Sequence, residues 1–185
     1  MTLKHPDILK HEFLILNYPD MDFIINRNQF FTSIFLENTT RFESRFKHLS
    51  LLVKYHEQTL PVFDADALLT DIYKCRIDRT LKLALISDLT TFSEMNRSLY
   101  KKHILKQHPD LSDKYIALKV NSHARIKTLL LSEIKLIPYG IRAKHNKEGI
   151  LGCRFSEEGN IQYFLDIETI FFNCISKTIL QIVSV

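Results

Sequence analysis

Residues 51–69, LLVKYHEQTLPVFDADALL, alternate between apolar runs and short polar breaks. Leu51–Val53 is apolar, Tyr55–Gln58 is polar, and Leu60–Phe63 is apolar again. Two apolar runs separated by a short polar break are typical of a β-hairpin. Asp64 ends the second run, and an aspartate in front of a helical apolar pattern is a typical N-cap. The stretch therefore predicts a strand, a tight turn, a second strand and the start of a helix.

The same pattern returns late in the chain, in Ile150–Phe171, ILGCRFSEEGNIQYFLDIETIF. Its turn is predicted at Glu157–Asn160 and its second strand at Tyr163–Leu165, and its capping aspartate is Asp166. The two capping aspartates are 102 positions apart, and the hairpins superpose at this offset without a gap. Similarity at one fixed offset indicates a repeated architectural unit.

The chain upstream of each hairpin matches at the same offset. Phe13–Leu16 falls on Tyr115–Leu118, and Ile24 falls on Ile126. Identity between the two halves is low, so chance matching of apolar runs contributes to the similarity. We predict a single mainly β domain of two lobes with short helices.

The division of the chain follows from these matches. Lobe 1 is expected at about residues 12–89, a helical insertion at about 90–113, and lobe 2 at about 114–185. The insertion is predicted because apolar and aromatic residues recur there at helical spacing, and Pro109 ends the pattern. The expected stripe consists of Phe92, Met95, Leu99 and His103, with Tyr100 and Ile104 beside it. An insertion of this kind covers a lobe edge or forms a binding surface of its own.

Four further segments carry weaker expectations. Phe30, Phe31, Ile34 and Phe35 have helical spacing and are predicted to form a short core-facing helix after Asn28. Residues 37–50, with Arg41, Arg45, Lys47 and His48, are predicted to be an exposed loop, and 138–140 a turn. The apolar end, Ile175–Val185, fits a helix or a helix followed by a strand.

Composition limits the possible functions. The net charge of +4 is too small to indicate nucleic-acid binding by itself, and the chain has only four glycines and no glycine-rich phosphate loop. Its three cysteines form no CxxC pair, which favours reduced thiols in the cytosol. The N-terminal residues have no signal-peptide pattern, and no apolar run is long enough to span a membrane. We expect a soluble cytoplasmic protein without membrane insertion.

No catalytic, cofactor-binding or metal-binding group is predicted. The eight histidines include no HExxH pair, and His103 and His108 are five apart, which is the wrong spacing for one face of a helix. Asp64 and Asp166 would be the only candidates for a carboxylate pair in acid–base chemistry, but helix capping explains both. We expect a non-enzymatic protein with no small-molecule substrate.

Nucleic-acid binding is the alternative class. Basic residues gather in Arg41–His56 and Lys101–Lys106, and Tyr55 and Tyr100 lie among them, as a surface for stacked bases requires. Acidic residues are interleaved with these basic ones, which weakens the interpretation. An interaction module that uses edge strands or the groove between its lobes fits the residues better.

The order of these segments resembles the CheW-like domains of bacterial chemotaxis. The most specific pieces are Leu60–Asp64, LPVFD, followed by a Leu-Leu helix start, and Gly149–Asp166; Tyr115–Leu131 is similar to the second lobe's entry. The resemblance implies two SH3-like five-stranded β-barrels packed about a shared apolar core, with the helical insertion between them. It also implies a chemotaxis signal-transduction adaptor that couples a CheA-like histidine kinase to the cytoplasmic tip of chemoreceptors.

One segment departs from the family's pattern. Family members usually carry Asn-Leu-Arg-Gly before the second strand of the first hairpin, where this chain has Lys54-Tyr55-His56-Glu57. A side chain at the glycine position resists a positive φ. We predict that the exposed turn formed by Lys54, Tyr55, His56, Glu57 and Gln58 binds a partner, with a solvated hairpin tip as the simpler alternative. A diverged scaffold with changed partners also stays open.

Overall fold

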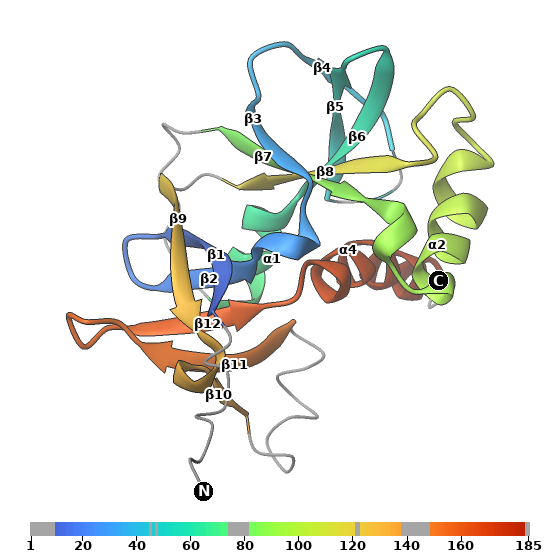
Figure 1. The fold of residues 1–185 in the computed structure, drawn as a ribbon. Helices are drawn as coiled ribbons and strands as arrows, with labels where there is room; N and C mark the ends of the chain where they lie inside the picture. The colour runs from blue at the N-terminus through green and yellow to red at the C-terminus, as the bar shows by residue number, and fades with distance from the viewer. Residues whose placement is uncertain are drawn as a thin grey trace, which may run out of the picture.

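The computed structural model describes residues 10–44, 46, 48–73, 82–120, 123–137 and 149–183, and it confirms a mainly β protein with two curled sheets. Figure 1 shows the sheets at opposite ends of the molecule with helices between and beside them. Arg45, Lys47 and the turn predicted at 138–140 lie outside the described residues.

Each sheet has six strands among the described residues, one more than the resemblance implies. In spatial order the first sheet contains β3 (Thr32–Phe35), β7 (Leu83–Asp88), β8 (Tyr115–Val120), β6 (Gln58–Asp64), β5 (Leu49–Tyr55) and β4 (Thr39–Arg41). The second contains β10 (Lys135–Leu136), β11 (Ile150–Phe155), β12 (Ile161–Leu165), β2 (Asp22–Asn26), β1 (Lys10–Asn17) and β9 (His123–Leu130). We call them the β3–β8 sheet and the β9–β12 sheet.

Helical segments join and cover the sheets. The regular helices are α1 (Ala65–Tyr73), α2 (Glu94–Tyr100) and α4 (Ile167–Val183). Short turns of helix are η1 (Arg27–Gln29), η2 (Leu89–Thr91), η4 (Leu131–Glu133) and the π-helical turn η3 (Lys101–Leu105). The apolar C-terminal run is therefore helical as far as Val183.

The central strands have continuous apolar sequences because both of their faces are buried. Alternate side chains of a strand point to opposite faces of the sheet. In β1, Leu14 and Leu16 join the core shared by the two sheets, while Phe13 and Ile15 fill the inside of the β9–β12 sheet. A strand buried on both faces has an apolar sequence without polar alternation, as FLIL shows.

The shared core joins both sheets through the helices. Its centre is Phe171 of α4, whose ring packs edge-on against Phe63 of β6 at 5.0 Å and Phe92 at 5.4 Å. Tyr100 of α2 contacts the same ring at 6.0 Å. Smaller clusters fill the concave side of each sheet. The shared apolar core expected from the resemblance is thus present.

The two sheets repeat one topology, but the chain does not divide where the sequence predicts. In both sheets a hairpin leads into a helix, β5–β6–α1 in one and β11–β12–α4 in the other, and the hairpin's second strand pairs in parallel with β8 or β2. The matching order makes β8 the counterpart of β2, and β7 that of β1. The predicted match of Phe13–Leu16 with Tyr115–Leu118 therefore aligns strands that are not equivalent, and residues 10–26 complete the sheet of the C-terminal half.

The helical insertion confirms the helical prediction but not its position between the lobes. It connects β7 to β8, which are hydrogen-bonded neighbours in one sheet. Its buried face consists of Asn96, Tyr100 and Ile104, whereas Met95 is 62% exposed, so the stripe is rotated relative to the prediction. The face is fixed by Glu168 of α4, which accepts hydrogen bonds from Ser93 N at 2.7 Å and Asn96 Nδ2 at 2.6 Å.

Two local predictions are wrong. Phe30–Phe35 is not a core helix, because η1 ends at Gln29 and β3 pairs with β7; strand geometry buries Phe30 and exposes Phe31 and Phe35. Residues 37–50 are not simply an exposed loop, since they include β4 and the buried His48. Backbone pairing across the sheet decides both outcomes, and local spacing does not reveal it.

Candidate partner-binding surface

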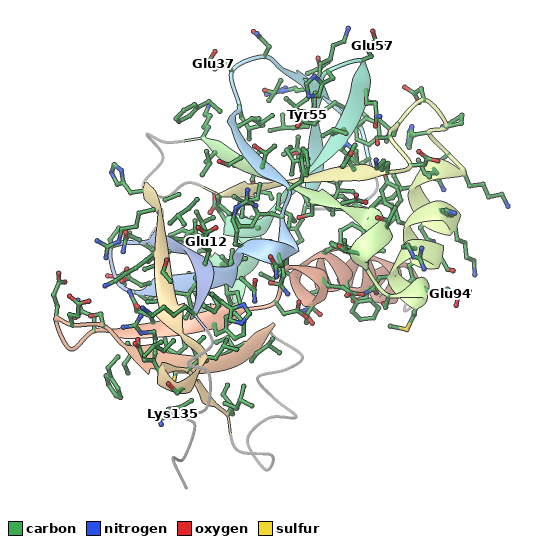
Figure 2. All side chains as sticks on the ribbon, viewed as in Figure 1. Glu12, Glu37, Tyr55, Glu57, Glu94 and Lys135 are labelled. Atoms are coloured by element: carbon green, nitrogen blue, oxygen red, sulfur yellow. The ribbon has the colours of Figure 1, made fainter. Side chains whose placement is uncertain are left out.

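The predicted turn lies at an exposed end of the β3–β8 sheet. Tyr55 pairs with Gln58 at the end of β5 and β6, so His56 and Glu57 form a two-residue turn. The positive φ belongs to His56, at 52°, and not to Glu57 at the family's glycine position. Figure 2 shows Tyr55 and Glu57 at the same end of the molecule as Glu37, opposite Lys135. Among the five predicted residues, Tyr55 is half-buried and the other four are exposed.

Aromatic rings extend from this turn across the sheet. His56 packs edge-on against Tyr55 at 4.4 Å, Tyr55 against Tyr115 of β8 at 6.2 Å, and Tyr115 lies 6.1 Å from Phe31. We call Phe31, Tyr115, Tyr55 and His56 the aromatic row. Phe31 is 57% exposed, so the row ends on an open surface. Its members come from three separate segments, which is why sequence inspection found only two of them.

The tip of the hairpin is held in place by the end of the insertion. Ser112 N donates to Thr59 O at 2.9 Å, and Ser112 Oγ donates to Gln58 Oε1 at 2.5 Å. Ser112 O in turn accepts from the buried hydroxyl of Tyr100 at 2.7 Å. Gln58 is therefore a tethered residue and not a freely solvated one. This contact gives the insertion a second role beside covering α4.

Charge beside the aromatic row comes from Lys114. Its Nζ lies 4.9 Å from the centre of the Tyr115 ring, a cation–π distance. Hydrogen bonding to the Tyr115 side chain raises the pKa of this exposed lysine. The row therefore presents a fixed positive charge next to exposed aromatic surface.

A groove of about 530 Å³ lies where the outer strands of the two sheets approach each other. It is lined by β3 (Thr32, Ser33, Phe35), β9 (His123, Ala124, Ile126), Leu14, Arg27, Phe30 and Leu83. Among the described residues, β3 and β9 each pair on one side only. Phe35 is 65% exposed and Ile126 is 57% exposed, so apolar surface borders two free strand edges.

One charged side chain in the groove is already fixed. Arg27 donates from Nη1 to Phe30 O at 2.6 Å and from Nη2 to Phe31 O at 3.1 Å, and its guanidinium lies 4.5 Å from the Phe30 ring. These contacts hold a cation at one end of the groove. The sequence interpretation named the groove in general terms and did not identify its residues, because Phe30 and Phe35 were assigned to a core helix.

Asp64 and Asp166 cap the helices that follow them, as predicted. Asp64 Oδ1 accepts from Ala67 N at 3.0 Å, and Asp166 Oδ2 accepts from Thr169 N at 3.2 Å. Their other oxygens are also engaged, by Lys119 Nζ at 2.8 Å and Gln29 Nε2 at 2.7 Å. Carboxylates occupied in this way hold helices and side chains, so neither is arranged as an acid or base.

No group of three or more His, Cys, Asp and Glu side chains in the described part of the chain is placed to hold a metal ion. No helix described in the structure is both long enough and apolar enough to cross a membrane.

Comparison with known proteins shows similarity to solved structures. No family model matches the chain, and no curated protein matches it. The crystal structure of the scaffolding protein TtCheW from Thermoanaerobacter tengcongensis is similar, with a TM-score of 0.58 over 88% of this chain and 92% of that chain. Because the identity is only 7%, the structural similarity establishes the fold alone, and this fold is CheW-like.

Proposed function

We propose that this chain is a non-enzymatic signal-transduction adaptor of the CheW type, which couples a CheA-like histidine kinase to the cytoplasmic tip of chemoreceptors. The observation that carries the proposal is the groove between β3 and β9, which combines exposed apolar side chains with two strand edges that no described strand pairs with. The CheW-like fold supports the same class of function. These partners would place the protein in the cytoplasm.

The groove suits a receptor tip because of its size and lining. A helical hairpin buries its apolar face in a groove of this kind, and the anchors lie three or four residues apart. Phe35 and Ile126 offer apolar contact from opposite walls, and the exposed Phe and Ile side chains otherwise remain in water. Burying such a side chain stabilises a complex by about 1.5–3 kcal/mol.

The aromatic row offers a second, separate surface. In CheW-like adaptors the kinase's regulatory domain has the same fold, and lobes meet end to end. The row covers an end of the β3–β8 sheet, and aromatic residues dominate the centres of many protein interfaces. We therefore assign the kinase to this end and the receptor to the groove. The Lys54–Gln58 turn belongs to the kinase-facing surface under this assignment.

The test is binding of the purified chain to two purified partners from the same genome, the regulatory domain of a CheA-like kinase and a receptor-tip hairpin. Isothermal titration at about 50 and 200 mM salt should give micromolar or tighter dissociation constants that change little with salt. No binding to either partner contradicts the proposal and favours a scaffold with changed partners. Binding to a single-stranded oligonucleotide that weakens steeply with salt would favour the nucleic-acid class instead.

The two surfaces are separated by paired variants. Tyr55→Ala with His56→Ala should weaken kinase binding at least tenfold and leave receptor binding unchanged. Equal losses for both partners would contradict the assignment of separate surfaces, and unchanged affinity for both would leave the turn as a solvated hairpin tip.

A further inference from the structure

A second cavity, of about 290 Å³, lies beside the helical insertion and away from the groove. Its polar lining comes from Thr90, Arg97, Lys101, Asp113 and Lys114, and its apolar wall from Leu89 and Tyr100. Three of these side chains are cations and one is a carboxylate, so the lining has a net charge of +2. We call this cavity the insertion pocket.

Arg97 and Lys101 face the insertion pocket together because they are four residues apart on one helix. Side chains at this spacing lie on the same face, and like charges there repel each other and destabilise the helix. Lys114 adds a third positive charge from the chain that follows the insertion. Glu94, the acidic residue in the first turn of α2, does not line the pocket. Asp113 is the one carboxylate in the lining, so the pocket keeps an excess of positive charge that an anion would neutralise.

Arg97 carries an unsatisfied donor. Its Nε is buried and has no hydrogen-bond partner among the described residues. Buried side-chain donors nearly always have a partner, and those of charged groups are the most costly to leave unpaired. An arginine presents its Nε and Nη donors in a planar fork that matches the oxygens of phosphate. The Arg97 guanidinium therefore has donor capacity that no described residue uses.

The local backbone keeps this arrangement rigid. Tyr100 is buried between the pocket and the shared core, and its hydroxyl is tied to Ser112 O. The helix widens at Lys101, where Lys106 N donates to Lys101 O at 3.0 Å in a π-helical turn. Single π-helical turns occur frequently at functional sites. Arg97 and Lys101 therefore extend from a helical segment whose inner face is fixed, and Lys114 extends from the bend before β8.

We propose that the insertion pocket binds a phosphate group, either as inorganic phosphate or as a small phosphate monoester. Arg97 supplies paired donors from its guanidinium, and Lys101 and Lys114 neutralise the remaining charge. Asp113 is exposed at the rim and disfavours a second anionic group. The size of the cavity leaves room for a few atoms attached to the phosphate, which a monoester would supply.

The test uses the whole chain labelled with ¹⁵N, titrated separately with inorganic phosphate and with glycerol 3-phosphate at constant ionic strength set by chloride. The Arg97 Nε–Hε resonance and the amides of residues 89–101 should shift in a saturable manner. Tighter binding of glycerol 3-phosphate identifies a monoester as the better ligand, and tighter binding of inorganic phosphate identifies the free ion. No saturable shift with either probe would overturn the proposal.

Adjacent lysines provide the matched control. Lys101→Gln removes a lining cation and should weaken the binding of phosphate about fivefold or more, while Lys102→Gln removes the same charge from an exposed residue outside the lining and should change it less than twofold. Arg97→Gln should weaken it at least about tenfold. Equal effects of the two lysine variants would mean non-specific attraction and would overturn the proposal.

Discussion

Ser112 Oγ donates a hydrogen bond of 2.5 Å to Gln58 Oε1, and this contact joins the end of the helical insertion to the tip of the β5–β6 hairpin. The same oxygen accepts from Tyr115 N at 2.9 Å and from Lys114 N at 3.2 Å. One buried hydroxyl thus organises the start of β8 and the predicted partner-binding turn together.

Ser112→Ala should lower the free energy of unfolding by about 1–3 kcal/mol, because it leaves the Tyr115 amide and the Gln58 side chain without their partner. Urea denaturation measures the change. Ser98→Ala, an exposed position on α2, should stay within about 0.5 kcal/mol of the unaltered chain. A Ser112→Ala effect as small as that of the control would show that water replaces the hydroxyl without cost.

Substitutions of His56 should differ in stability according to how easily the new residue adopts a positive φ. Its φ of 52° lies in the left-handed region, which costs most residues about 1–2 kcal/mol and costs glycine almost nothing. His56→Val should therefore be clearly less stable than His56→Gly, although both lose the ring contact with Tyr55. Thermal unfolding of the two variants side by side measures the difference. Equal stability would mean that the turn changes its conformation to suit the residue.

Phe35→Ala should weaken the binding of the receptor-tip hairpin at least tenfold, and it should change stability by less than about 0.5 kcal/mol because the side chain is exposed. Phe155→Ala is a matched control: both side chains are 65% exposed, but Phe155 does not line the groove. Titration of each variant with the hairpin compares them. Similar losses for both would argue against the groove as the receptor site.

Asp166→Ala should lower the free energy of unfolding by about 1–2 kcal/mol through loss of the cap on α4. The carboxylate also accepts from Thr169 Oγ1 at 2.6 Å and Gln29 Nε2 at 2.7 Å, so the loss extends beyond the helix. Asp110→Ala, at an exposed turn, should have little effect. Guanidinium denaturation gives the comparison, and equal values for the two variants would count against the capping role.

Tyr100 should make stability depend on pH in the alkaline range. Burial raises the pKa of its phenol above the ordinary value of about 10, and the nearby Asp113 carboxylate raises it further. Since the folded state holds this proton more tightly than the unfolded state, the stabilisation is complete below pH 10 and is lost as the pH rises above it. Tyr100→Phe should reduce this loss. Unfolding measured at pH 9 and pH 11 tests it, and an unchanged pH dependence would contradict the assignment.

Local sequence patterns predicted the hairpins and caps well, because these features depend on neighbouring residues. The Tyr55–Gln58 turn, the Glu157–Asn160 turn and both capping aspartates lie where the alternation of apolar and polar residues places them. Gly159 has a φ of 83°, as the second turn requires. The mainly β class was predicted for the same reason, and the CheW-like fold was predicted from the resemblance in the order of the segments.

Long-range pairing was not predictable in the same way. Parallel pairing places Leu165 beside Ile25, and no feature of either apolar run specifies that partner. A fixed offset compares strands in chain order, so it matched β1 with β8 although their roles in the sheets differ. The groove was missed for a related reason: the exposure of Phe35 depends on β3 being an outer strand, which only the assembled sheet decides.

β1 and β2 belong to the same sheet as β9–β12, so this sheet can form only after the C-terminal strands have been synthesised. Gln162 and Asp22 are partners separated by 140 positions, so the ribosome releases β2 long before β12 exists. The β1–β2 hairpin therefore has both of its apolar faces exposed until the C-terminal strands are synthesised. Pairing across so much chain closes slowly, and chaperones would have most opportunity to bind during that interval.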